Sequence, residues 1–198
     1  KFTKQDCWEF KVKNNYVQLL DIGVGNVGTW KFCLSKIGFN VTFVKRIDEI
    51  EKEIPMVVPG VGAFDNAIAS VEAFGLSGIK KTEYKVLGTC LGMQIFFESS
   101  SEGGSIGLSR FKGSFTTLNK VQIGWKIVDD NEYYFLHRFG LRDKDSHIEQ
   151  FLKSSFTDDG VLAAFRAPNF VGCQFHPERS GENGLKLLKQ ELQWLSSE

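Results

Sequence analysis

Cys90 lies in a local pattern that can turn a thiol into a nucleophile. The segment Gly88-Thr89-Cys90-Leu91-Gly92 is a G-x-C-x-G motif between a predicted strand, Lys85–Leu87, and a predicted helix, Leu91–Glu98. Such an elbow holds the reactive residue in a strained turn, and the small glycines let strand and helix approach each other. We expect Cys90 to project into solvent beside the helix N-terminus, whose unpaired N–H groups favour the thiolate. The alternative is that Cys90 is a small buried apolar residue.

A thiol nucleophile needs a base, and the sequence offers three histidines: His137, His147 and His176. His176 follows a predicted strand and precedes Pro177, which has no N–H to donate and so directs the chain away from a sheet. Glu178 comes two residues after the histidine, where a carboxylate can fix the tautomer and orientation of the imidazole. These residues predict a Cys-His-Glu relay.

Acyl chemistry also requires hydrogen-bond donors for a developing oxyanion. The short predicted strand Met56–Val58 runs into Pro59 and then into Gly60, Val61 and Gly62. This glycine-rich backbone is expected beside the elbow, so its N–H groups and the N–H of Leu91 are the candidate donors.

These residues need a scaffold, and the sequence predicts an α/β domain with a mostly parallel sheet covered by helices on both faces. Strands and helices alternate at intervals of roughly 30 residues, which favours parallel pairing with functional residues at the strand C-termini. From about Ile106 to Phe175, shorter alternating and aromatic runs favour antiparallel additions. The predicted early elements are the strand Val17–Gly23, the helix Val27–Ile37 and the strand Val41–Val44, and the chain closes with a predicted helix over Gly184–Leu195.

The composition fits one globular domain of 198 residues, 42% of them hydrophobic. We assign residues 1–16 to an N-terminal extension and residues 17–198 to the domain. The 24 basic and 24 acidic residues balance, so we expect neither nucleic acid nor a membrane surface as a partner. No apolar stretch approaches a membrane span or a secretion signal, and we expect a cytoplasmic protein. Cys7, Cys33 and Cys173 show no metal-binding spacing and are predicted to be structural; no metal or cofactor is expected.

One competing interpretation is a dinucleotide site. Gly23, Gly25 and Gly28 form a G-x-G-x-x-G pattern between a predicted strand and a predicted helix. Lys45 and Arg46 at the end of the next strand would suit a 2′-phosphate. This interpretation leaves the elbow and the His-Pro-Glu segment without a role.

Successive blocks of the sequence resemble the glutaminase subunit of imidazole glycerol phosphate synthase, a triad-type, class I glutamine amidotransferase. The blocks are PGVGAF, GTCLGMQIFFESS, GLSRFKG, IGWK, YYFLH and VGCQFHPERSGENGLKLL, and the resemblance extends from Val17 to Leu195. It implies a flavodoxin-like fold that hydrolyses L-glutamine to glutamate and ammonia. It also implies a heterodimer in which the ammonia passes to a (β/α)₈ cyclase, which makes imidazole glycerol phosphate and AICAR in histidine biosynthesis.

The resemblance also assigns roles to individual residues. It makes Cys90 the nucleophile, His176 the acid and base, and Glu178 the residue that orients it. It places Gly60, Val61 and Gly62 in the oxyanion strand, Gln94 at the bound glutamine, and Asn26, Trp125 and Arg179 at the partner interface. The segment that should contact glutamine is His137-Arg138-Phe139 here, where the family usually has His-Ser-Tyr, and Lys126 replaces a usual Asn after Trp125.

These departures leave three other functions open. One is a related subunit that supplies ammonia for amidino groups on bacterial surface sugars. The second is a non-catalytic binding subunit, and the third is a hydrolase of another small amide.

Overall fold

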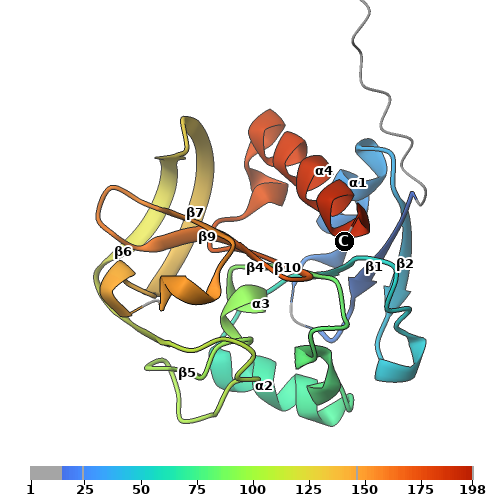
Figure 1. Ribbon diagram of the computed structural model, residues 1–198, viewed down its shortest axis with the longest axis horizontal. Coiled ribbons are helices and arrows are strands. Elements are labelled where there is room, and N and C mark those ends of the chain that lie inside the picture. The colour runs from blue at the N-terminus through green and yellow to red at the C-terminus, as the bar shows by residue number, and fades with distance from the viewer. Residues whose placement is uncertain (1–14, 24, 146, 198) are drawn as a thin grey trace, which may run out of the picture.

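The computed structural model describes residues 15–23, 25–145 and 147–197, and its main feature is a seven-stranded sheet (Figure 1). The strand order is β2-β1-β3-β4-β10-β9-β8. The first five strands are parallel to one another, β9 is antiparallel to β10, and β8 is antiparallel to β9. The parallel part has the flavodoxin-like order. The bounds are β1 Tyr16–Leu20, β2 Asn40–Val44, β3 Met56–Val58, β4 Val86–Thr89, β8 Lys153–Phe156, β9 Leu162–Ala167 and β10 Phe170–Cys173.

Helices cover both faces of this sheet, as the sequence predicted. α1 (Val27–Lys36) and α4 (Gly181–Ser197) lie on one face, and α2 (Phe64–Ala73) and α3 (Leu91–Gln94) lie on the other (Figure 1). Alternate strand residues enter two separate cores: Val57 packs with the α1 and α4 side chains, and the next residue, Val58, packs with those of α2 and α3. Short 3₁₀ turns complete the chain at Ile47–Glu49, Ser77–Lys80, Asp143–Asp145, Ile148–Gln150 and Pro177–Arg179.

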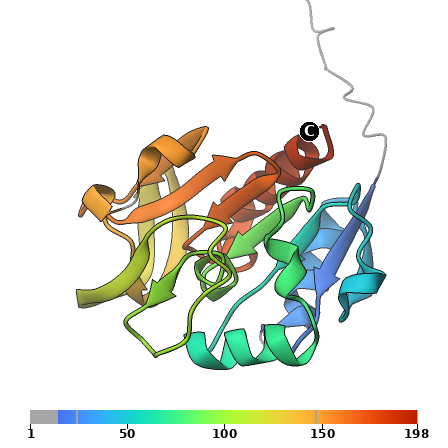
Figure 2. The same cartoon turned by 60° about the horizontal axis from the view of Figure 1, so that its bottom comes forward.

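A second, smaller sheet stands at the β8 end of the large one, away from β2 (Figures 1 and 2). It consists of β5 (Ser99–Ser100), β6 (Ser114–Val128) and β7 (Asn131–Gly140), and β6 and β7 form a long antiparallel hairpin. The hairpin turn contains Asp129 and Asp130, both with positive φ. The expected antiparallel additions in the second half of the chain are therefore present.

Several boundaries differ from the sequence prediction by one to four residues, and α4 begins at Gly181 and not at Gly184. The helix expected over Leu91–Glu98 ends at Gln94, because the next carbonyls bond elsewhere: Ile95 O accepts from Leu108 N at 2.7 Å and Phe96 O from Arg110 N at 2.8 Å. The first strand ends at Leu20 and not at Gly23, and it begins at Tyr16, inside the segment assigned to the extension. Residues 1–14, with Cys7, lie outside the described residues.

Candidate active site

The carboxyl ends of β3, β4 and β10 bring the predicted site residues to one edge of the sheet. These three parallel strands are neighbours, with Val58 opposite Gly88 and Thr89 opposite Cys173. The segments that follow the three strands therefore leave the sheet side by side. Cys90 N, just after β4, donates to Cys173 O at the end of β10 at 2.7 Å. His176 is three residues beyond Cys173, so the sheet places the histidine beside the cysteine although 86 positions separate them in the sequence.

Cys90 occupies the strained turn that the G-x-C-x-G motif predicted. Its backbone has φ 49° and ψ −119°, a conformation that costs on the order of 1–3 kcal/mol for a residue other than glycine. Gly88 and Gly92 make the turn possible: a Cβ on Gly88 would lie 2.7 Å from Gly92 O, and a Cβ on Gly92 would overlap Val58 O. The elbow therefore depends on close contact between strand and helix that only glycine permits.

The expectation that Cys90 projects into solvent was wrong. Its exposed fraction is only 7%, because the β6–β7 hairpin and the end of β10 cover the thiol. The Sγ atom lies 3.9 Å from Leu136 O of β7 and 3.7 Å from Gln174 Nε2. The thiol is nevertheless enclosed by polar groups, as a nucleophile requires.

His176 and Glu178 form a buried pair beside this thiol. Nδ1 of His176 lies 2.9 Å from Oε1 of Glu178, and the two side chains are 4% and 7% exposed. Burial lowers the pKa of His176, but hydrogen bonds to Cys90 and Glu178 and the charges of both outweigh burial and raise it to about 10. Because Nδ1 serves Glu178, Nε2 is the nitrogen available to the sulfur. The second carboxylate oxygen, Oε2 of Glu178, is buried without a partner among the described residues.

The predicted oxyanion strand lies directly against the elbow. A Cβ on Gly60 would overlap the backbone nitrogen of Gly92, and it would be 2.6 Å from the carbonyl carbon of Leu91. Leu91 begins the four-residue helix α3, whose first N–H groups have no partner within the helix. Val61 is 48% exposed, and Gly62 has a φ of 109° that favours glycine. The glycine-rich segment thus lies against the turn that holds Cys90.

Three of the four residues predicted to contact substrate are joined at the Phe139 carbonyl, and Arg138 is the exception. Gln94 is buried, and its Nε2 donates to Phe139 O at 3.4 Å. His137 is also buried; its Nδ1 donates to the same carbonyl at 2.8 Å, while its Nε2 has no partner among the described residues. Burial lowers the pKa of His137 to about 4, so this ring is neutral at pH 7. Phe139 is half-buried, but Arg138 points to solvent.

Two buried residues near the site were not predicted. Gln174 links Gln94 to the thiol, because its Oε1 accepts from Gln94 Nε2 at 3.1 Å while its Nε2 faces Sγ. Ser180 Oγ donates to His176 O at 2.6 Å and accepts from Tyr134 N at 2.9 Å, so it ties the histidine to β7. The sequence signal for Gln174 was a polar residue between the apolar Cys173 and Phe175 at the end of a strand. No sequence feature pointed to Ser180.

A cavity of about 240 Å³ opens beside the His176–Glu178 pair. Its lining includes His176 and Glu178, two glycine-strand residues, Gly60 and Val61, and two predicted interface residues, Asn26 and Arg179. Trp125 lies on the hairpin, 54% exposed. Tyr134 connects it to this cavity, since the Tyr134 ring is 6.0 Å from that of Trp125 and 4.2 Å from the Arg179 guanidinium.

The G-x-G-x-x-G loop has a structural role at this cavity. Asn26 Oδ1 caps α1 by accepting from Thr29 N at 3.1 Å, and a Cβ on Gly25 would meet the Pro59 ring at 3.0 Å. The basic residues that suited a 2′-phosphate already pair with carboxylates, Lys45 with Asp21 at 3.2 Å and Arg46 with Asp48 at 2.9 Å.

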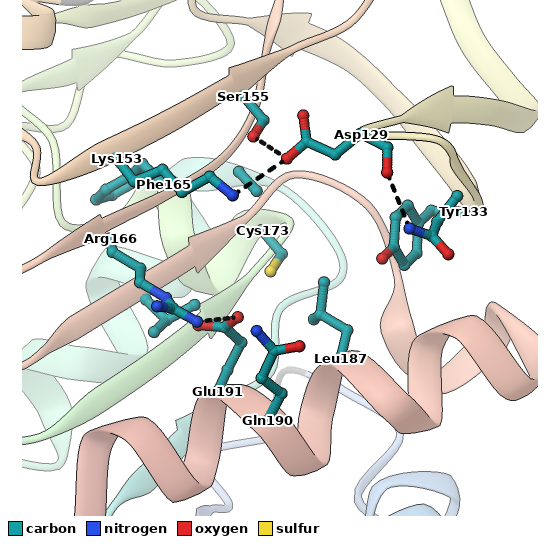
Figure 3. Close-up of a pocket in the computed structure, with 13 residues that line it drawn as sticks. Asp129, Tyr133, Lys153, Ser155, Phe165, Arg166, Cys173, Leu187, Gln190 and Glu191 are labelled. Carbon is teal, nitrogen blue, oxygen red and sulfur yellow. Dashed lines mark hydrogen bonds and ion pairs between the residues drawn. The ribbon is translucent and has the colours of Figure 1, made fainter. Parts of the chain in front are cut away.

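A second cavity, of about 180 Å³, lies between α4 and the strands β8 to β10 (Figure 3). Its charged side chains pair with one another: Arg166 with Glu191 at 2.7 Å and Lys153 with Asp129 at 3.6 Å. Ser155 also donates to Asp129, at 2.6 Å. Neither Cys90 nor His176 lines this cavity, which separates it from the chemistry.

The described part of the chain lacks two features, a metal site and a membrane-spanning helix. Among residues 15–23, 25–145 and 147–197, no group of three His, Cys, Asp or Glu side chains is arranged to hold a metal ion. In the same part of the chain, no helix combines the length and apolar character needed to cross a bilayer.

The family described as "Glutamine amidotransferase class-I" matches residues 18–194. The chain belongs to this family. Curated relatives of the amidotransferase are named "Imidazole glycerol phosphate synthase subunit HisH". The relative from Pyrobaculum aerophilum is 36% identical, with 89% of this chain and 96% of the relative covered. The relative from Oceanobacillus iheyensis is 32% identical over 88% and 96% of the two chains.

Solved structures agree with the fold of the amidotransferase. A crystal structure of a glutamine amidotransferase superposes with a TM-score of 0.71 at 16% identity, and it covers 90% of this chain and 98% of its own. A glutamine amidotransferase from Thermotoga maritima gives a TM-score of 0.59 at 16% identity, over 91% and 95% of the two chains.

Proposed function

We propose that this amidotransferase is the glutaminase subunit of imidazole glycerol phosphate synthase, with Cys90, His176 and Glu178 as its catalytic triad. The observation that carries the proposal is the position of Cys90 beside the buried His176–Glu178 pair, at the ends of two neighbouring parallel strands. The sequence identity of 36% and 32% with proteins named HisH supports the histidine-pathway assignment.

The first half-reaction transfers the acyl group of glutamine to the enzyme. Because its pKa is raised to about 10, His176 already carries a proton on Nε2, and the Cys90 sulfur attacks the side-chain carboxamide carbon as the thiolate. Backbone N–H groups of Leu91 and of the Gly60–Gly62 strand stabilise the resulting oxyanion. His176 then donates its proton to the departing nitrogen, ammonia leaves, and a thioester remains on Cys90.

The second half-reaction restores the enzyme. A water molecule attacks the thioester while His176 takes one of its protons, and the tetrahedral adduct expels the sulfur. The proton taken from water stays on His176 beside the released thiolate as glutamate leaves, so one glutamine and one water give one glutamate and one ammonia. Glu178 keeps the imidazole in the tautomer that serves both steps.

We assign Gln94, His137, Arg138 and Phe139 to glutamine binding. Gln94 and His137 support this assignment because both are buried near the thiol, and His137 Nε2 is an acceptor without a partner among the described residues. Arg138 is exposed on the same strand, and its positive charge suits the α-carboxylate of glutamine.

We propose that the ammonia passes to a (β/α)₈ cyclase, which docks over Asn26, Trp125 and Arg179. The cavity beside His176 supports this, because two of these three residues line it. The test is glutaminase activity of the purified chain, alone and with a HisF-type cyclase. Stimulation and a stable complex are expected; equal turnover with and without the cyclase contradicts the partner assignment.

Trp125→Ala tests the docking surface, with Phe74→Ala as the matched control. Both aromatics are exposed, 54% and 40%, but Phe74 caps the end of α2 away from the hairpin. Tryptophan is enriched among the hot-spot residues whose truncation weakens binding by about tenfold or more. We expect such a rise in the Kd for the cyclase with Trp125→Ala and no change with Phe74→Ala.

A further inference from the structure

Gln174 is a fully buried polar side chain whose position has no role in the triad scheme. It follows β10, with an exposed fraction of 0%, and its own backbone N–H donates to Ala163 O at 2.8 Å. Its side-chain amide lies between two other site residues: Oε1 is 3.1 Å from Gln94 Nε2, and Nε2 is 3.7 Å from Cys90 Sγ. A buried amide is retained only where its hydrogen bonds are made.

The orientation of this amide follows from the groups on its far side. Phe139 O can only accept, so the group of Gln94 that faces it at 3.4 Å is the NH₂. The same NH₂ contacts Gln174, which therefore must present its oxygen. A flipped Gln174 would set two NH₂ groups against each other, so the remaining direction, N–H toward sulfur, is fixed by the network.

We propose that Gln174 is a positioning residue for the nucleophile: its amide, aimed by Gln94, donates a hydrogen bond to Cys90 Sγ and stabilises the thiolate over the thiol. The physical reason is that a donor stabilises a charged acceptor more than a neutral one, and the difference grows where water is excluded. Cys90 is 7% exposed, and α3 has only four residues to contribute a dipole. The proposal rests on the role of Cys90 as the nucleophile.

Several other groups lie around or act on the Cys90 sulfur. From the 177–179 turn, His176 faces Cys90, and Glu178 holds the imidazole. From β7, Leu136 O lies 3.9 Å from Sγ. His137 of the same strand interacts with His176, and the charges of Lys126 and Asp159 act on His137 from further out. Gln174 is the uncharged donor in this set, so replacing it leaves these titrating groups in place.

The experiment measures the rate of Cys90 alkylation by iodoacetamide in the full chain as a function of pH, with peptide mass spectrometry to separate Cys90 from the other cysteines. Gln174→Met keeps the length of the side chain and removes the donor. We expect the midpoint pH of alkylation to rise by about one unit, the size of one hydrogen bond to a charged group. Gln174→Glu keeps an acceptor for Gln94 but adds negative charge, so its midpoint should rise further.

Gln18→Met is the matched control. Gln18 is 1% exposed, and its Nε2 donates to Glu51 O at 2.8 Å and Ile54 O at 2.9 Å near the opposite ends of the strands. It should lower the melting temperature without moving the Cys90 midpoint. If Gln174→Met does not fold, Gln174→Leu takes its place, because leucine is also uncharged and has no donor.

An unchanged midpoint in a folded Gln174 variant overturns the proposal, and so does an equal rise in Gln18→Met. The readout contains no glutamine, so it is independent of turnover. If Cys90→Ala keeps its glutaminase activity, the nucleophile assignment fails instead. If Cys90→Ala is inactive while the Gln174 midpoints stay unchanged, only the role of Gln174 is lost.

Discussion

Nδ1 of His176 lies 2.9 Å from Oε1 of Glu178, although only Pro177 separates the two residues in the chain. The short 3₁₀ turn over Pro177–Arg179 makes this possible, since it folds the glutamate back toward the ring. The orientation of the base is thus a local property of the His-Pro-Glu segment. The meeting of this segment with Cys90 is a property of the sheet.

This difference predicts unequal effects for the two residues. His176→Ala removes the proposed acid and base and should lower kcat by about 10²–10⁴-fold, whereas Glu178→Gln removes only the proposed orienting contact and should lower it by about 10–10²-fold. Both values come from glutamine turnover with the cyclase present. A loss in Glu178→Gln as large as that in His176→Ala would argue against a purely orienting role.

His137 predicts a pH-dependent stability. The pKa of this buried histidine is about 4 in the folded chain, against an ordinary value of 6.5, so the unfolded state binds more protons between these pH values. Stability is therefore lost as the pH falls through this window, by up to about 3 kcal/mol from this residue. Urea unfolding at pH 7 and pH 4 should show that His137→Gln removes this share of the loss. An unchanged loss in the variant would mean that His137 is charged in the fold.

Ser180 should stabilise the fold next to His176, because its hydroxyl bonds to the His176 backbone. Ser180→Ala removes the hydrogen bond to His176 O and the acceptor for the partly buried N–H of Tyr134. We expect a loss of about 1–3 kcal/mol in the free energy of unfolding, together with lower turnover. Ser196→Ala is the control, because its hydroxyl bonds only to Leu192 O within α4. Equal effects of the two substitutions would contradict a link between Ser180 and the site.

Gly60 predicts a steric effect at the proposed oxyanion strand. Gly60→Ala must displace the strand from Gly92, because the new Cβ would overlap its backbone nitrogen, whereas Gly104→Ala meets nothing within 4 Å. We expect Gly60→Ala to lower kcat at least tenfold and to cost about 1–3 kcal/mol of stability. Gly104→Ala should change neither. Normal turnover in Gly60→Ala would remove this strand from the mechanism.

Much of this architecture was predictable because its signals are local. The elbow at Cys90 was readable from its glycines, and the parallel core was readable from apolar runs such as Met56–Val58 that end at glycine or proline. The strand C-termini then placed the elbow, the glycine strand and His176 at one edge. The structure confirms that arrangement.

The errors arise where distant segments decide the outcome. The predicted exposure of Cys90 was wrong because Leu136, 46 residues further along the chain, covers the thiol, and no local pattern records that contact. The helix after the elbow was predicted too long because the 107–111 segment takes the carbonyls that would have continued it. Gln174 was missed for the same reason, because the position of its amide matters only through its contacts with Gln94 and Cys90, which are distant in the sequence.

The most direct test of the account is covalent trapping of the nucleophile by a diazoketone analogue of glutamine, followed by peptide mass spectrometry and a turnover assay. We predict one adduct per chain on Cys90, none on Cys33 or Cys173, and loss of both adduct and glutaminase activity in Cys90→Ala. An adduct on another residue, or sustained turnover by Cys90→Ala with the cyclase bound, would contradict it.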